Sequence, residues 1–492
     1  MRNKIIVAAT TAALLGVATW IALPSASAST VADPYFPDDG NPGVDVLHYD
    51  VAIGWDKGVL SGDTTLTIKA TAKLPEFHLD LSGLTVSAVD VNGRAAKFRR
   101  EGAHELVITP AKAIVKGAQF KTRIRYGGKP TGEGWHVYPN GGALALGEPH
   151  SATSWYPADD HPSDKATFHL TATVPDGWTA IGNGEPEPVR TAKGKTVFRW
   201  NEDRPVATYL TTVAIDKFTV RRSKMPDGTP MLFAYGDGID PRPESEAAVP
   251  KIIKLFSKLF GPYPFASVGA IAVNGVEAGN VPQAIETQRR PTFQGGFFDV
   301  SLSHELAHQW FGNNVSFTDW RDGCIAECFA QYANQLWEEA EYDSDLDNFF
   351  YAAMLRQSLD DPDFWSVRLY DPGPGRELHP ALYDKGSMML HALRRMVGDD
   401  AFFGTLKRWQ RDHRDGNASF PDFEKLAAQV SGKNLTGFFA EWAHSTTEPS
   451  DANLRPGSLA GVQPLPSDDD SDGPGRPDEP EIKTPESKAR PG

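Results

Sequence analysis

The sequence predicts an α+β protein in which a β-rich N-terminal domain, residues 33–233, precedes a mainly helical domain, residues 234–448. From about Val44 to Val220, short apolar segments such as "TTLTIKA" and "FKTRIRYGG" alternate with turn residues, as strands do. After about Ala234, apolar residues recur at helical spacing, as in "AAVPKIIKLFSKLF" and "KGSMMLHALRRMVG". A chain of 492 residues is too long for one compact core, so we expect two folded domains and further segments outside them.

The composition excludes one class of partner. The formal net charge is -15, and no stretch of the chain concentrates lysine and arginine. Binding to nucleic acid needs a concentrated basic surface, so we expect no nucleic-acid partner.

The first 28 residues have the pattern of a signal peptide. Arg2 and Lys4 precede the apolar run Ile5–Leu23, and "ASA" at residues 26–28 suits a signal peptidase. We therefore expect cleavage after Ala28, a secreted protein, and no stable membrane association afterwards. The alternative is a retained membrane anchor, because the apolar run is almost long enough to span a bilayer.

The C-terminal residues 449–492 are rich in proline and acidic residues, as in "LPSDDDSDGPGRPDEPEIKTPESKARPG". Such a composition has almost nothing to bury, so we predict a disordered tail.

The motif "HELAH" supplies His304, Glu305 and His308. Residues four apart on a helix lie about 40° apart around its axis, so both imidazoles can bind a single ion. Glu305 then lies beside them, within reach of a metal-bound water. Alone, the motif is equally compatible with two surface histidines.

The segment after this motif strengthens the metal hypothesis. "FGNN" is a helix stop signal, and "DWRDGCIAECFAQYANQLWEEA" resumes helical spacing. Two helices joined by a loop can pack antiparallel, which would bring Glu327 back beside His304 and His308. Two nitrogens and one carboxylate leave a fourth position open, as in a catalytic zinc site with one Zn²⁺ per chain.

The only two cysteines, Cys324 and Cys328, flank Glu327. Helical geometry turns both side chains away from the direction of the carboxylate, so we do not expect them to bind the metal. Free cysteine behaves mainly as a small buried hydrophobe, and we predict that both pack in the core. The alternative is a disulfide within one helical turn.

Several motifs in order resemble one family. "HELAHQWFGNNV" followed by "AECFA" resembles the zinc aminopeptidases of the aminopeptidase N and leukotriene A4 hydrolase type, which are gluzincins. "FHLDLSGL", "WYPADDHPSDKATF", "FGPYPF" and "LYDKGSMMLHALRRMVGDDAFF" extend the likeness over roughly Asp45 to Trp442. The resemblance implies a β-saddle N-terminal domain, a thermolysin-like catalytic domain, and removal of N-terminal residues from peptides with a free N-terminus. This chain would be a short form that lacks most of the large C-terminal helical domain.

The resemblance also implies roles for single residues. His304, His308 and Glu327 match the zinc ligands, and Glu305 matches the general base. Tyr383 in "LYDKG" matches the tyrosine that stabilises the oxyanion. Without the family, a tyrosine ahead of a helix for which Asp384 is a candidate N-cap is more often a packing residue.

The substrate's free amine would be bound by carboxylates. Glu148 matches one family position for this contact. The family's G-x-M-E-N segment is absent as such, and "GVEAGNVPQAIETQRRP" stands in its place. Glu286 and Glu277 are both candidates there, and Glu286, with strand-like neighbours, is favoured. Two other functions stay open, namely epoxide or ester hydrolysis at the same zinc and peptide binding without catalysis.

Overall fold

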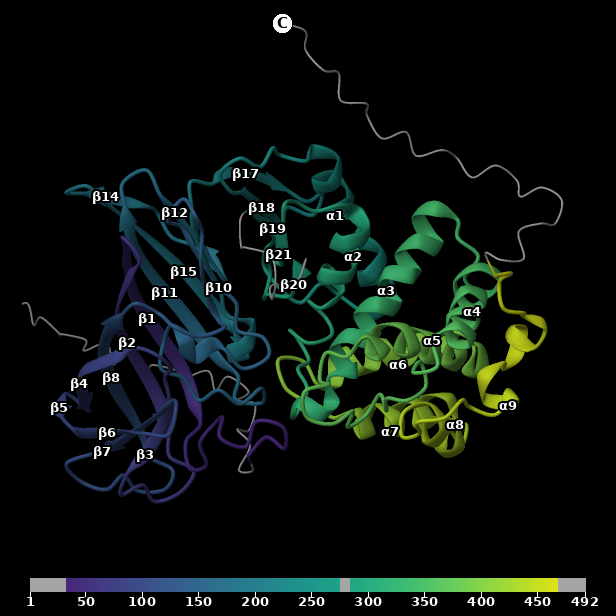
Figure 1. Cartoon of the computed structure of the whole chain (residues 1–492), viewed down its shortest axis with the longest axis horizontal. Coiled ribbons are helices and arrows are strands. Elements are labelled where there is room, and N and C mark those ends of the chain that lie inside the picture. The colour runs from purple at the N-terminus through teal and green to yellow at the C-terminus, as the bar shows by residue number, and fades with distance from the viewer. Residues whose placement is uncertain (1–31, 275–283, 468–492) are drawn as a thin grey trace, which may run out of the picture.

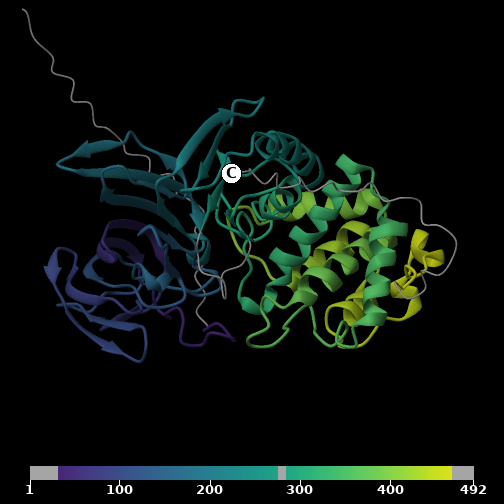
Figure 2. The ribbon, with the colours of Figure 1, turned by 45° about the horizontal axis from the view of Figure 1, so that its top comes forward.

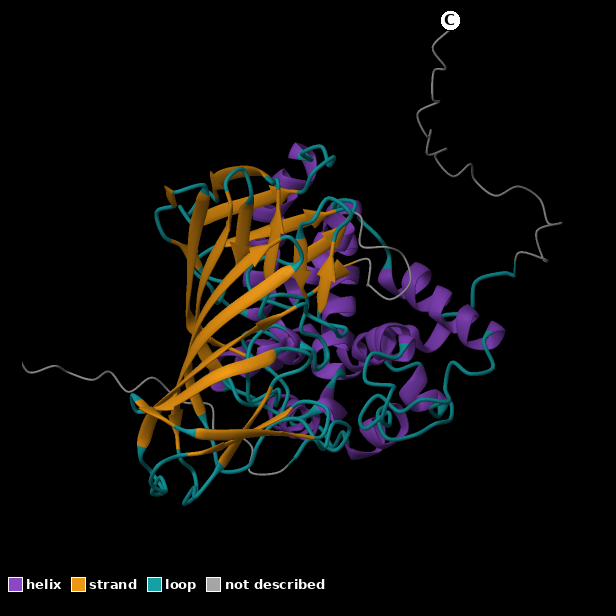
Figure 3. Ribbon diagram, turned by 60° about the vertical axis from the view of Figure 1, so that its left-hand side comes forward, coloured by secondary structure: helices purple, strands orange, loops and turns teal. Residues whose placement is uncertain are grey.

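The computed structural model describes residues 32–274 and 284–467. The predicted α+β class is confirmed, because strands fill the N-terminal half and helices dominate the second half (Figures 1 and 3). The predicted signal peptide and Glu277 lie outside the described residues. Within these ranges, the structure contains no helix that combines the length and the apolar character needed to cross a bilayer.

A nine-stranded sheet forms the body of the N-terminal domain. Its strands pair in the order β13-β15-β11-β1-β2-β8-β4-β5, with β14 added beside β15. Buried and partly exposed residues alternate strictly along β11, because successive side chains of a strand point to opposite faces. The strands are β1 (Val46–Asp56), β2 (Val59–Lys69), β4 (Thr85–Val91), β5 (Arg94–Ala95), β8 (Gln119–Gly128), β11 (Ala166–Pro175), β13 (Glu185–Pro186), β14 (Arg190–Ala192) and β15 (Lys195–Val206).

Two smaller sheets complete this domain. One has the order β12-β16-β10-β9 and the other β3-β7-β6. Every residue of the two central strands β10 and β16 is buried, and the chain leaves β10 only a few residues before Glu148. The strands are β3 (Phe77–Asp80), β6 (Lys97–Glu101), β7 (Glu105–Thr109), β9 (Trp135–Val137), β10 (Ala143–Ala145), β12 (Thr179–Gly182) and β16 (Val213–Asp216).

The second domain begins earlier than the sequence indicated. Its five-stranded sheet has the order β17-β18-β19-β21-β20, and the crossover from β18 to its parallel neighbour β19 is helix α1. The predicted boundary at residues 233 and 234 falls inside β18. A hairpin has the same local pattern in either domain, and only its pairing with β19 assigns it to the second. The elements are β17 (Thr219–Lys224), β18 (Pro230–Tyr235), α1 (Pro243–Phe260), β19 (Val268–Val273), β20 (Ala284–Ile285) and β21 (Thr292–Gln294).

Helices make up the remainder of the second domain, and α3 packs against both α2 and α5 (Figure 2). Asn334 Nδ2 of α3 donates to the carbonyl of Val300 at 2.8 Å, while Glu327 at the other end of α3 faces His308, so α2 and α3 run antiparallel. The α-helices are α2 (Asp299–Ala307), α3 (Cys324–Tyr342), α4 (Ala352–Asp360), α5 (Pro380–Val397), α6 (Asp399–Asp412), α7 (Phe420–Ser431) and α8 (Thr436–Trp442). A π-helical stretch, Leu346–Tyr351, leads into α4, and 3-10 turns lie at Ala152–Ser154, Thr208–Leu210 and Trp320–Asp322.

The prediction of a disordered tail from residue 449 is wrong for its first part. Helix α9 (Asp451–Leu454) and a 3-10 turn (Gly457–Gly461) follow α8. Leu454, Leu459 and Val462 are buried, so these residues have enough apolar surface to pack on the domain. The acidic, proline-rich part from residue 468 lies outside the described residues.

A buried lysine joins the two domains. Lys165, directly before β11, donates from Nζ to the carbonyls of Asn313 at 2.8 Å and Asn314 at 3.1 Å. Its side chain is buried, and burial lowers its pKa to about 7. Both carbonyls belong to the loop that follows "HELAH", so the N-terminal domain directly supports the chain next to the candidate metal site.

Candidate metal centre and substrate site

Three side chains converge where α2 and α3 meet. His304 lies in the last turn of α2, His308 directly follows the end of that helix, and Glu327 lies in the first turn of α3. The two Nε2 atoms are 3.2 Å apart, and Glu327 Oε2 is 3.5 Å from His304 Nε2 and 3.6 Å from His308 Nε2. The antiparallel pairing of the two helices, as predicted, thus brings together residues distant in the sequence.

Neighbouring acceptors fix the tautomers of both histidines. Nδ1 of His304 lies 3.0 Å from Gln331 Oε1, and Nδ1 of His308 lies 3.2 Å from the carbonyl of Phe311. An oxygen acceptor requires a proton on Nδ1, so in each neutral ring Nε2 carries a lone pair. Two lone pairs that face each other at 3.2 Å repel unless a cation lies between them.

The donor set fits zinc. Four ligand atoms in tetrahedral positions, each about 2.0–2.2 Å from a zinc ion, would lie roughly 3.3–3.6 Å from one another. The three separations match this spacing closely. Oε2 of Glu327 is buried and has no hydrogen-bond partner among the described residues, as expected for an atom that binds a metal.

The charges of the trio suit a dication. Burial lowers the pKa of His308 to about 4, which keeps this ring neutral and able to bind a metal. Burial also raises the pKa of Glu327, but His308 and His304 outweigh this effect and its pKa is lowered. Burial lowers the pKa of His304, but Glu327 and Glu305 outweigh this effect and its pKa is raised. A metal ion at Nε2 would displace the proton there, so the site offers two imidazoles and one carboxylate anion to a metal.

Glu305 lies beside this trio but is not one of its members. It is 6% exposed, and burial raises its pKa to about 7. Its Oε2 atom is buried without a hydrogen-bond partner in the described part of the chain. A carboxylate with a free oxygen next to a metal site is placed to accept a proton.

Tyr383 approaches the site from α5. Its ring lies nearly parallel to that of His304, at a centroid distance of 5.9 Å and an angle of 19°, and its hydroxyl is close enough to Glu327 to help lower the pKa of that carboxyl. Burial and then Glu327 raise its pKa, so the hydroxyl keeps its proton. The helix begins at Pro380 with His379 as N-cap, so Asp384 is not the N-cap; its carboxylate instead accepts from Gln357.

Glu148 and Glu286 form a second acidic group that shares Glu327. One oxygen of each carboxylate lies within 4.8 Å of the others. Burial and then the neighbouring carboxylates raise the pKa of Glu148 and that of Glu286. Both oxygens of Glu286 are buried, and Oε2 lies 3.2 Å from Nδ1 of His308. Because burial lowers the pKa of His308 to about 4, that ring is neutral and the group lacks a compensating positive charge.

Gly312 of "FGNN" makes room for Glu286. A Cβ atom at Gly312 would lie 2.7 Å from Glu286 Oε2, and the backbone there has a φ of +106°. Both the close approach and this left-handed backbone favour glycine. The loop after α2 therefore shapes the acidic group as well as the metal trio.

The prediction of two free cysteines is wrong. Cys324 and Cys328 form a disulfide within the first turns of α3, the alternative left open by the sequence. Both are fully buried, so the predicted location in the core is correct. A spacing of four residues suits both core packing and a cross-link over one turn, because it places both side chains on one stripe of the helix. Neither sulfur belongs to the metal trio.

Sequence reasoning missed Gln331 and Arg289. Gln331 lies four residues after Glu327 on the same helix face, and that spacing could have indicated a partner for His304. Arg289 contacts carboxylates of the other domain, and nothing in the local sequence points to this contact.

Comparison with known proteins agrees with the arrangement of both halves. Residues 46–210 match the peptidase M1 N-terminal domain, and residues 298–442, which include all three candidate ligands and Tyr383, match the peptidase family M1 domain. The chain belongs to peptidase family M1. The predicted resemblance to this family of zinc metallopeptidases is thereby confirmed.

Solved M1 structures cover nearly all of this fold. The crystal structure of an M1 zinc metallopeptidase from Deinococcus radiodurans has a TM-score of 0.77 and 28% identity, and the match covers 86% of this chain and 99% of that one. A further structure of that protein, a variant, is bound to a Tyr-Ser-Ala substrate.

Longer relatives match over part of their length. A probable aminopeptidase from Sulfurisphaera tokodaii is 26% identical over 81% of this M1 chain and 53% of its own length. An aminopeptidase N from Lactococcus lactis is 24% identical over 79% of this chain and 49% of its own. The chain thus spans about half the length of these curated relatives.

Proposed function

We propose that this M1 protein is a secreted zinc aminopeptidase that removes N-terminal residues from peptides. One observation carries the proposal. The half-buried carboxylate of Glu148 and the buried carboxylate of Glu286 lie directly beside the metal trio, with Glu327 common to both groups.

This position suits a substrate's terminal ammonium. An ammonium group donates to several carboxylates at once and supplies the missing positive charge. Because the acidic group adjoins the metal trio, only the first peptide bond can reach the metal when the amine is bound. An acetylated N-terminus offers no charge and leaves both carboxylates unpaired, which disfavours binding.

His304, His308 and Glu327 would hold the zinc. When bound, the zinc would act as a Lewis acid that lowers the pKa of a water molecule and polarises a carbonyl. Glu305 would accept the proton of the attacking water at Oε2 and pass it to the leaving amine. Tyr383 would donate a hydrogen bond to the oxyanion of the substrate, while Glu148 and Glu286 hold its amine.

The test compares aminoacyl anilides with free and with acetylated α-amines, alongside zinc measured per chain. We expect one zinc per chain and hydrolysis of the free amines alone. Equal hydrolysis of both series would instead favour a general hydrolase, and no hydrolysis with full zinc would favour a peptide-binding relative.

Secretion is a separate part of the proposal, and it rests on the N-terminal sequence. N-terminal sequencing of the protein from culture medium should begin at Ser29. Recovery of Met1 in the medium would contradict cleavage of the predicted signal.

A further inference from the structure

Glu286 is followed by a short segment, residues 287–290, that lies between the two domains and contains a strained residue. Arg289 has a φ of +75°, in the left-handed region that residues other than glycine seldom occupy. It is also 2% exposed. A buried residue keeps such a backbone only when its contacts hold it there.

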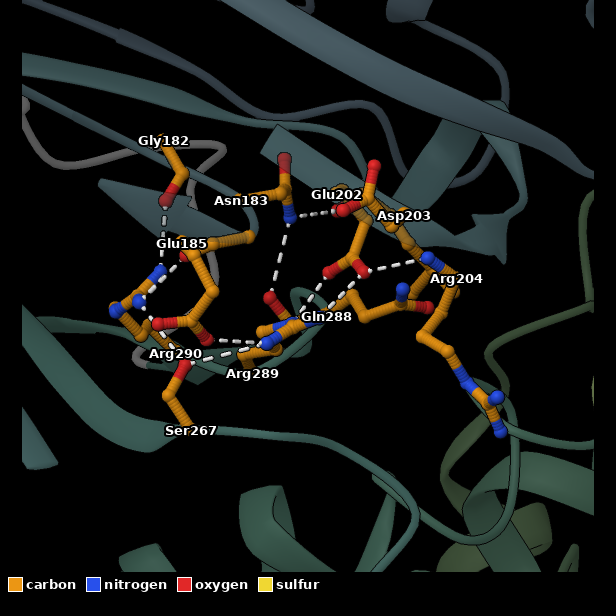
Figure 4. A network of polar contacts seen from close by, with 12 residues as sticks. Gly182, Asn183, Glu185, Glu202, Asp203, Arg204, Ser267, Gln288, Arg289 and Arg290 are labelled. Carbon is orange, nitrogen blue, oxygen red and sulfur yellow. Dashed lines mark hydrogen bonds and ion pairs between the residues drawn. The ribbon is translucent and has the colours of Figure 1, made fainter. Parts of the chain in front are cut away.

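The charged partners of the Arg289 side chain belong to the N-terminal domain (Figure 4), while within its own domain the guanidinium contacts the Ser267 hydroxyl at 3.3 Å and the Phe265 ring. Its guanidinium donates to both oxygens of Glu202 on β15, from Nε at 2.5 Å and from NH2 at 2.7 Å. NH1 donates to Glu185 at 2.6 Å. Glu202 is fully buried, so the two-pronged pair is closed to water. Glu185 is 42% exposed, which makes its contact with Arg289 the weaker one.

The backbone of the same segment is tied to the metal loop. The Arg289 amide donates to Gln309 Oε1 at 2.6 Å, and Gln309 Nε2 donates to the Thr287 carbonyl at 3.2 Å. Gln309 directly follows His308. The position of Arg289 is therefore coupled both to Glu286, three residues before it, and to a candidate zinc ligand.

Two further side chains hold the ends of the segment (Figure 4). Arg290 donates to the carbonyls of Gly182 at 2.9 Å and Gly184 at 2.7 Å. Asn183 Nδ2 donates to the carbonyl of Gln288 at 3.2 Å. These three partners belong to the N-terminal domain, which therefore contacts each of residues 288, 289 and 290.

We propose that Arg289 is a positioning residue for Glu286, and that through its pair with Glu202 the N-terminal domain takes part in recognising the substrate's amine. The inference rests on the proposed role of Glu286. Arg289 itself lies against Glu202 and acts only through the backbone that it holds. Without the pair, the segment 287–290 loses its buried ion pair with the N-terminal domain, and the Glu286 carboxylate moves away from the amine.

The decisive variant is Arg289→Gly, because glycine accepts the left-handed backbone and only the side-chain contacts are lost. The probes are leucine hydroxamate and its counterpart without the α-amine, 4-methylpentanoyl hydroxamate. Both bind zinc through the hydroxamate, and only the first carries an ammonium. Calorimetry on the zinc-loaded protein gives the ratio of the two dissociation constants.

In Arg289→Gly we expect the preference for the amine-bearing hydroxamate to fall about tenfold or more, since a charged hydrogen bond is weakened, with one zinc per chain retained. A merely structural defect would weaken both ligands equally and leave the ratio unchanged, which would overturn the proposal. Glu202→Gln should lower the ratio in the same direction. Glu185→Gln is the matched control, and it should leave the ratio within about twofold because exposed pairs contribute little.

Two further variants, Glu286→Gln and the double variant, distinguish failure of this inference from failure of the proposed function. If Glu286→Gln leaves the ratio unchanged, Glu286 does not bind the amine and the proposed function loses its support. If Glu286→Gln lowers the ratio and Arg289→Gly does not, the positioning role alone is wrong. In the double variant, which carries both Arg289→Gly and Glu286→Gln, the ratio should be no lower than in Glu286→Gln alone, because both changes act on one contact. Additive losses would show that Arg289 acts independently of Glu286.

Discussion

Gln331 Oε1 lies 3.0 Å from Nδ1 of His304, one turn of α3 beyond Glu327. One helix therefore supplies both a candidate metal ligand and the acceptor that orients another candidate ligand. Replacing such a partner commonly costs about 10–100-fold in metal affinity, and we expect this loss in Gln331→Leu. Competition with a calibrated zinc chelator measures it.

Gln335→Leu is the control for this prediction. Gln335 lies one turn further along α3, and its Nε2 donates to Asn334 rather than to a histidine. This variant should bind zinc like the unaltered protein. Equal affinities in Gln331→Leu and Gln335→Leu would show that the Gln331 contact contributes nothing to the site.

Glu305→Gln tests the proton acceptor. An amide cannot take a proton from water, and we expect kcat to fall by about 10²–10⁴-fold. Zinc content should stay at one per chain, because Glu305 is not a member of the metal trio. Steady-state kinetics with metal analysis checks both parts, and turnover near that of the unaltered enzyme would eliminate Glu305 as the base.

Tyr383→Phe removes one hydroxyl and keeps the ring that lies parallel to His304. Loss of a hydrogen-bond donor to the oxyanion should lower kcat by about 10²–10³-fold. KM should change little, because the hydroxyl contributes mainly in the transition state. A rise in KM at constant kcat would instead assign Tyr383 to substrate binding.

Gly386 of α5 lies directly against the disulfide of α3. A Cβ at this position would be 2.3 Å from Cys328 Sγ, so Gly386→Ala should lower the free energy of unfolding by about 1–3 kcal/mol. Gly437 of α8 is exposed with open space around it, and Gly437→Ala should raise that free energy by about 0.5–1 kcal/mol. Urea unfolding of both variants makes the comparison.

Thiol titration of the denatured, unreduced protein should find no free thiol, and a reactive thiol there would disprove the disulfide.

Buried carboxyls in the N-terminal domain should make stability depend on pH. Burial raises the pKa of Asp160 from 3.8 to about 8 and that of Asp80 from 3.8 to about 7. The folded state then binds more protons than the unfolded state between about pH 4 and 8, so stability falls as pH rises through this range. Asp160→Asn mimics the neutral form. The difference between its Tm and that of the unaltered protein should therefore shift in favour of the variant as the pH is raised from 5 to 8.5. Exposed Asp56→Asn should show no such trend.

Local patterns in the sequence were sufficient for the elements that carry the metal trio. The spacing of His304 and His308, the stop at "FGNN" and the renewed helical period before Glu327 each reflect the helix repeat, and antiparallel packing then follows from the loop. Glu286 could be favoured over Glu277 because its neighbours have a strand pattern.

Contacts between distant segments could not be read in the same way. The partners of Arg289 lie in the other domain, and the assignment of β18 depends on its pairing with β19 rather than on its own residues. The ordered residues after Pro449 pack through a few scattered apolar side chains, which an average over composition conceals. In each case the information lies in tertiary pairing.

The hydrogen bonds of Lys165 across the domain interface affect how a substrate binds at the site. Separating the two domains would break the hydrogen bonds from its Nζ to the carbonyls of Asn313 and Asn314. Opening and closing about the domain interface is therefore disfavoured. We therefore expect an arriving peptide to meet carboxylates and metal ligands whose relative positions are already set across the domain interface.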